Sequence, residues 1–114
     1  MKVVSPAVHG ILDYVTVLVF LLAPAAVGLS GFAGALSYAL AAIHLAMTLV
    51  TGFPLGALRL LPFAIHGWVE RIVGPVLIVL ALAAGFDSAA RAFYAVMGLV
   101  ILLVGALTDY ARCA

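Results

Sequence analysis

Two short motifs in this chain combine a histidine, a glycine and an acidic residue in the same order. They are His9-Gly10 with Asp13, and His66-Gly67 with Glu70, 57 positions later. Only 8% of the residues are charged, and a charged side chain in hydrocarbon costs at least about 2.5 kcal/mol, so such groups need partners. Imidazoles and carboxylates together can form hydrogen-bonded pairs, bind a metal ion or transfer protons. The two motifs are therefore the candidate functional site.

The spacing inside each motif suits a helix. The histidine and the acidic residue are four positions apart, which places both side chains on one helical face. If both faces point into a bundle, four side chains meet near its centre: His9, Asp13, His66 and Glu70. Two imidazoles and two carboxylates are a sufficient ligand set for a divalent metal ion such as zinc, iron or manganese.

The motifs lie at the start of the first and third of four apolar segments, which cover residues 6–29, 32–52, 62–86 and 88–108. Each segment is close to the roughly 20 residues that a helix needs to cross a bilayer. A hydrophobic content of 68% and a mean hydropathy of +1.41 are typical of a chain surrounded mostly by lipid. We expect an all-α fold, an integral membrane bundle of four transmembrane helices, with residues 1–114 forming a single membrane domain.

The register of 57 residues extends beyond the motifs, because it also aligns Gly28 with Gly85 between the paired segments. Each repeated unit contains two spans, so both units enter the membrane in the same direction. The sequence therefore predicts two tandem helical hairpins, residues 6–53 and 62–110. A pseudo-two-fold axis along the membrane normal would relate them.

A further line of small and polar residues follows the second segment at spacings of three and four: Ser37, Ala41, His44, Thr48 and Thr51. This periodicity predicts one inward-facing seam on a helix. His44 is expected to lie deeper in the membrane than His9, by about 12 Å at a rise of about 1.5 Å per residue. It has no counterpart in the repeat, because position 101 is isoleucine.

Two more charged residues lie near the motifs. Arg71 directly follows Glu70, and we expect it to neutralise that acid or to extend toward the membrane interface. Asp109 lies at the end of the fourth segment, where it would extend a ladder of ionisable groups from the membrane surface toward His44.

The distribution of the remaining charges predicts the orientation and excludes several functions. Lys2, Arg59 and Arg112 flank one side of the membrane and Arg91 the other, so the positive-inside rule places both termini and the middle loop in the cytoplasm. A net charge of +1 with scattered basic residues offers no face for nucleic acid. Cys113 is the single cysteine, which excludes an intramolecular disulfide. The chain contains no nucleophile elbow or phosphate loop, so enzymatic activity is not the favoured interpretation.

Four roles for the clustered residues remain open. They could be polar contacts that hold the helices together, or a site for a divalent metal. A haem b held by His9 and His66 is a variant of the second role, with His44 as a further candidate ligand whose depth argues against a shared haem plane. The third role is a relay for protons or cations, and the fourth is quinone or lipid binding nearby. The lipid bilayer is the expected partner, and a homo-oligomer or a larger membrane complex is compatible with the sequence.

Three stretches carry a resemblance to a known group: Ser5-Pro6-Ala7-Val8-His9-Gly10-Ile11-Leu12-Asp13-Tyr14, Pro62-Phe63-Ala64-Ile65-His66-Gly67-Trp68-Val69-Glu70 and Leu107-Thr108-Asp109-Tyr110. The chain resembles, over nearly its whole length, small bacterial membrane proteins related to the SPW-repeat group. This resemblance implies a tandem-hairpin architecture in a bacterial inner membrane. It implies no established activity.

Overall fold

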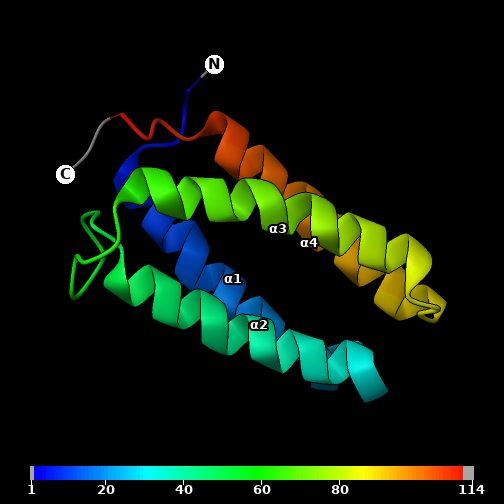
Figure 1. The fold of residues 1–114 in the computed structure, drawn as a ribbon. Coiled ribbons are helices and arrows are strands. Elements are labelled where there is room, and N and C mark those ends of the chain that lie inside the picture. The colour runs from blue at the N-terminus through cyan, green and yellow to red at the C-terminus, as the bar shows by residue number, and fades with distance from the viewer. Residues whose placement is uncertain (1, 112–114) are drawn as a thin grey trace.

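The computed structural model describes residues 2–111 and shows four α-helices joined by short connections (Figure 1). The helices are α1 (Pro6–Ala26), α2 (Gly31–Val50), α3 (Phe63–Ala83) and α4 (Ser88–Leu107). Each is long and apolar enough to cross a membrane. The prediction of an all-α protein with four candidate spans is confirmed. Arg112 and Cys113 lie outside the described residues.

Two of the helices end well before the apolar segments that predicted them. α1 ends at Ala26 and α3 at Ala83, each three residues before the end of its segment. Gly28 and Gly85 have φ angles of 71° and 72°, in the left-handed region that commonly follows the end of a helix. The apolar residues around them belong to the turns, which is why hydropathy alone extended the helices too far.

Side-chain caps mark the starts of α1 and α4. The hydroxyl of Ser5 accepts a hydrogen bond from the backbone N–H of Val8, and the carboxylate of Asp87 accepts one from Ala90. Such caps satisfy N–H groups that have no partner within the helix. Pro6, the first residue of α1, lacks an N–H that would otherwise need a partner there.

The helices pack as two antiparallel hairpins, α1 against α2 and α3 against α4. Gly74 and Gly98 allow close approach in the second hairpin: a Cβ on Gly98 would lie 2.6 Å from the carbonyl oxygen of Gly74. Both termini of the described chain and the connection at residues 51–62 lie at one end of the bundle, which we call the termini end (Figure 1). The two tight turns lie at the opposite end, the turn end.

The interior changes character along the bundle. Toward the turn end it is mostly apolar, with buried Phe20, Leu77 and Tyr94 among the core residues. Toward the termini end it contains the buried histidines and carboxylates. The seam predicted on the second segment is buried at every position, namely Ser37, Ala41, His44 and Thr48 on α2 and Thr51 just after it. The buried histidines and carboxylates therefore lie in the half of the helices nearer the termini end.

Candidate functional site

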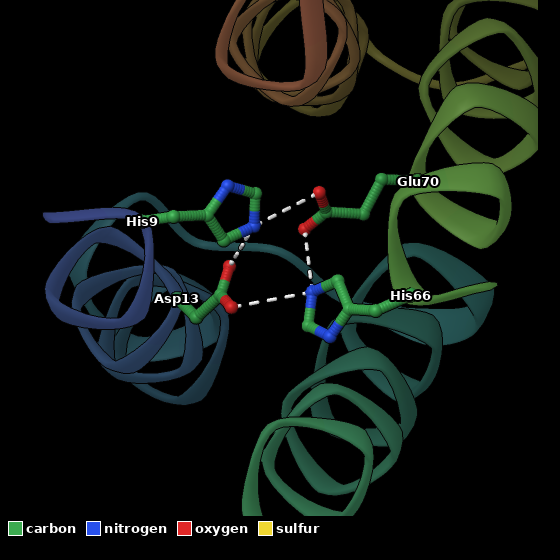
Figure 2. Close-up of side chains that lie close together, drawn as sticks. All are labelled: His9, Asp13, His66 and Glu70. Carbon is green, nitrogen blue, oxygen red and sulfur yellow. Dashed lines mark hydrogen bonds and ion pairs between the residues drawn. The ribbon is translucent and has the colours of Figure 1, made fainter. Parts of the chain in front are cut away.

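The four motif side chains converge between α1 and α3 and form a closed ring in which histidine and carboxylate alternate (Figure 2). We call them the quartet: His9, Asp13, His66 and Glu70. His9 Nε2 lies 3.3 Å from Asp13 Oδ1 and 3.1 Å from Glu70 Oε2. His66 Nε2 lies 3.2 Å from Asp13 Oδ2 and 3.2 Å from Glu70 Oε1. Their exposed fractions are between 0% and 4%, so the site is shielded from solvent.

Each quartet histidine is anchored by a threonine from the other hairpin. His9 Nδ1 lies 2.8 Å from Thr108 Oγ1, and His66 Nδ1 lies 2.8 Å from Thr51 Oγ1. Both threonine hydroxyls donate their own proton to a backbone carbonyl four residues earlier, at 2.6 Å. Each hydroxyl oxygen must then accept from the histidine. The Nδ1 atoms therefore carry a proton, and the Nε2 atoms face the carboxylates.

With both carboxylates ionised, the quartet can be electrically neutral in two ways. If both Nε2 atoms are also protonated, two imidazolium ions balance two carboxylates. If both Nε2 atoms offer lone pairs, a divalent cation would balance the same carboxylates. Either state avoids an uncompensated buried charge, which would be strongly destabilising.

Several contacts in this cluster are short without being aligned as hydrogen bonds. His9 Nε2, Asp13 Oδ2 and His44 Nε2 are buried and have no hydrogen bond of good geometry within residues 2–111. The same atoms lie 3.1–3.3 Å from oppositely charged or polar partners. Of the four contacts around the ring, the one between His66 Nε2 and Glu70 Oε1 is aligned as a hydrogen bond in the described chain, and the other three are short contacts of poor direction.

His44 joins the cluster from α2, where its Nε2 lies 3.3 Å from Asp13 Oδ1. The ring centroids of His44 and His66 are 6.2 Å apart, so His44 lies beside the quartet and is not about 12 Å deeper than its histidines, as the sequence predicted. The histidine side chain is 11% exposed, and it adjoins a pocket of about 50 Å³ whose other lining residues are apolar: Phe20, Leu40, Ile43, Met47, Val69, Val73 and Ile101.

Aromatic rings cover the quartet at the termini end. The ring of His9 packs edge-on against Phe63 and Tyr110, with centroid distances of 5.2 and 5.7 Å. The Tyr110 hydroxyl donates a hydrogen bond to Glu70 Oε2 at 3.3 Å. Burial, and then the negative charge of Glu70, raise the pKa of the Tyr110 phenol above its ordinary value. Tyr110 therefore stays protonated and acts as a donor to the carboxylate.

The glycine of each motif makes room for this cover. A Cβ on Gly67 would lie 2.6 Å from ring carbons of Tyr110, and a Cβ on Gly10 would lie 2.8 Å from Leu55 Cδ1. Both distances are far shorter than van der Waals contact. The repeated His-Gly pair thus combines a histidine that faces inward with a glycine that lets a covering side chain lie directly on the helix.

Arg71 does not form an ion pair with Glu70 within the described chain. Its guanidinium lies over the rings of Trp68 and Tyr110, 4.9 and 5.4 Å from their centroids. These are cation–π contacts. Of the two roles expected for Arg71, direct neutralisation of the acid has no contact to support it.

Three other predicted residues make bonds outside the quartet. The Asp109 carboxylate accepts from the backbone N–H of Ala111. The hydroxyl of Ser37 donates to Phe20 O at 2.6 Å, and that of Thr48 donates to His44 O at 2.7 Å. Ser37 and Thr48 therefore line the interior without contacting the quartet, whereas Thr51 is part of its support.

Sequence reasoning did not single out Thr108 or Tyr110 as site residues. The repeat contained a signal for Thr108, because Thr51 and Thr108 are 57 positions apart. Each of them accepts a hydrogen bond from a quartet histidine. The same register pairs Tyr110 with Phe53, so the hydroxyl of Tyr110 is particular to the second half.

No protein-family model, curated protein or solved structure matches the chain.

Proposed function

We propose that this chain is a small integral membrane protein that binds one divalent transition-metal ion at the quartet. The observation that carries the proposal is the convergence of one ligand atom from each of His9, Asp13, His66 and Glu70, all within 4.8 Å of one another. Zinc binds nitrogen and oxygen ligands at about 2.0–2.2 Å, so neighbouring ligands around a tetrahedral ion lie about 3.3 Å apart. The four ring contacts are 3.1–3.3 Å long, with one oxygen of each carboxylate facing His9 and the other facing His66.

The anchored histidines support the same proposal. A metal-binding histidine usually donates its second ring N–H to another group, which fixes the tautomer and the ring orientation. Thr108 and Thr51 provide this support for His9 and His66. The ligand atoms would thus be held in place before an ion arrives, which lowers the cost of binding.

The ligand types narrow the choice of ion. Imidazole suits zinc and iron, carboxylate suits manganese, and magnesium and calcium prefer sites made only of oxygen ligands. Two nitrogens with two carboxylates therefore favour Zn²⁺, Fe²⁺ or Mn²⁺ over Mg²⁺ and Ca²⁺. A redox role would follow only with iron or manganese, because zinc has no redox chemistry.

The other roles have less support. A haem b between His9 and His66 would need space that the carboxylates of Asp13 and Glu70 occupy, 3.1–3.3 Å from both imidazoles. A relay across the whole membrane lacks buried histidines and carboxylates toward the turn end, where the described core is mostly apolar. The pocket beside His44, at about 50 Å³, is well below the roughly 300 Å³ of usual ligand pockets, so quinone binding is disfavoured. A purely cohesive quartet is the main competitor.

We also propose the tandem-repeat arrangement and the membrane orientation expected from the sequence. The helix bounds support the repeat, because α3 and α4 begin and end 57 residues after α1 and α2. The resemblance to the SPW-repeat group supports the same arrangement in a bacterial inner membrane. Lys2 and Arg59 lie at the termini end, and a cytoplasmic location of this end follows from the positive-inside rule.

The test is metal analysis of protein purified in detergent, followed by titration of the chelator-treated protein with Zn²⁺ and Co²⁺. We expect one ion per chain, and a loss of binding in Asp13→Asn and Glu70→Gln, which keep the side-chain size but remove the charge. Asp109→Asn is the matched control, because its carboxylate lies outside the quartet. If the parent binds no metal and its absorbance spectrum has no Soret band from haem, the quartet only holds the helices together.

A quartet that only holds the helices together predicts a different result for the double variant His9→Ala with His66→Ala. A cohesive quartet requires a large loss of thermal stability in detergent whether or not metal is present. A metal site requires in addition that Zn²⁺ raise the thermal stability of the parent and leave that of the double variant unchanged. The comparison of both proteins with and without Zn²⁺ separates the two roles.

A further inference from the structure

The four quartet residues occupy equivalent positions in the two halves of the repeat. Each carboxylate also has one further contact, and this contact differs between the halves. On Asp13, the additional contact comes from His44, whose Nε2 lies 3.3 Å from Oδ1. The equivalent position in the second half is Ile101, so Glu70 has no imidazole from α4. His44 is buried, and its Nε2 has no aligned hydrogen bond within residues 2–111. A buried nitrogen in this state costs about 1–3 kcal/mol unless a partner is supplied.

On Glu70, the additional contact comes from Tyr110, whose hydroxyl donates to Oε2 at 3.3 Å. The equivalent position in the first half is Phe53, which has no hydroxyl to offer Asp13. Tyr110 reaches this position because Gly67 leaves room for its ring. Each carboxylate thus has one partner outside the quartet, and the two partners are of different chemical types on the two halves.

These partners engage one oxygen of each carboxylate and leave the other. Tyr110 holds Glu70 Oε2, which also lies 3.1 Å from His9 Nε2, and it leaves Oε1 to the hydrogen bond with His66 Nε2 at 3.2 Å. His44 lies at Asp13 Oδ1, so Oδ2 remains. Asp13 Oδ2 is also the carboxylate oxygen that has no aligned hydrogen bond in the described chain. Both of these oxygens lie 3.2 Å from His66 Nε2, so they face the same imidazole, while the other two oxygens face His9.

We propose that His44 and Tyr110 are positioning residues that select which carboxylate oxygens bind the metal. This inference rests on the proposed metal site. The ion is then bound by Asp13 Oδ2 and Glu70 Oε1, each as a single-oxygen ligand, together with the Nε2 atoms of the quartet histidines. The repeat supplies the four ligands, and the two residues that depart from it fix the orientation of the carboxylates.

The repeat itself suggests the variants for the test. His44→Ile and Tyr110→Phe introduce the side chains that the other half of the chain already has, so neither brings a foreign shape into the bundle. Partners of this kind typically change metal affinity by about 10–100-fold. We expect a loss of that size for Co²⁺ and Zn²⁺ in each variant. We also expect a changed visible spectrum of bound Co²⁺, because a released carboxylate can bind through both oxygens.

Two controls separate positioning from general loosening of the bundle. Tyr94→Phe removes a phenol hydroxyl that donates to Ala33 O near the turn end, and Ser37→Ala removes a hydroxyl of the same seam as His44. Both should lower thermal stability without changing Co²⁺ affinity or spectrum. His44→Gln, which restores an N–H donor, should recover part of the affinity lost in His44→Ile.

The outcomes distinguish this inference from the proposed function. If the parent binds Co²⁺ and a variant binds it within threefold of the parent with the same spectrum, the positioning role of that residue is refuted and the metal site stands. If the parent does not bind Co²⁺, the proposed function itself fails. Reduced affinity and an altered spectrum, in metal-free variants that are at least as stable as the two controls, are the result that the inference requires.

Discussion

Gly67→Ala tests why a glycine follows the histidine in each motif. The new Cβ would lie 2.6 Å from two ring carbons of Tyr110, so the ring must move away and its hydrogen bond to Glu70 must lengthen. Overpacking of this kind costs about 1–3 kcal/mol. Alanine recovers up to about 1 kcal/mol, because it is a better helix former than glycine. We expect the free energy of unfolding to fall by about 1–2 kcal/mol.

The measurement is reversible unfolding in mixed detergent micelles, followed by the fluorescence of Trp68, the single tryptophan, and by circular dichroism. Gly105→Ala is the matched control, because its Cβ would meet the hydroxyl of Tyr110 at 3.7 Å, an ordinary contact. That variant should be as stable as the parent or slightly more stable. If Gly67→Ala matches the parent, or if Gly105→Ala is the less stable of the two, the explanation of the His-Gly pair is wrong.

Three further predictions concern the support of the site and the fold. Thr51→Val and Thr108→Val each remove the acceptor of a buried histidine N–H and should lower the free energy of unfolding by about 1–3 kcal/mol. Thr48→Val, which loses only the bond to His44 O, should cost less in the same unfolding assay. Zn²⁺ at 100 times its dissociation constant should raise the free energy of unfolding of the chelator-treated protein by about 2.7 kcal/mol; an unchanged transition would contradict metal binding. Asp87→Ala removes the cap of α4 and should cost about 1 kcal/mol, while Co²⁺ affinity measured in parallel should not change.

Local patterns predicted much of the fold. The lengths of the apolar segments identified four helices, and each begins within one residue of its segment. Hydropathy failed at the ends of α1 and α3, because apolar residues continue into turns whose path is set by the positive φ of Gly28 and Gly85. Hydropathy indicates whether a residue prefers an apolar environment. It does not distinguish a helix from an apolar turn.

The candidate site was predicted in part. The spacing of four residues placed each histidine and acid on one face, and the structure brings both pairs together. The same reasoning assigned Arg71 a role beside Glu70, whereas its guanidinium lies over two aromatic rings. Adjacency in sequence is a poor guide on a helix, because consecutive side chains point about 100° apart.

The sequence by itself determined the class of the protein, its four helices, the register of 57 residues and the face of each helix that carries the histidine and the acid. These properties follow from composition and helical periodicity, which act over short stretches of chain. Only the tertiary structure decided the partners of each group. His9 meets Thr108, 99 positions away, and Tyr110 lies on Glu70. Such contacts depend on how two hairpins dock, and docking is set by shape and by the need to satisfy buried polar groups across the whole bundle.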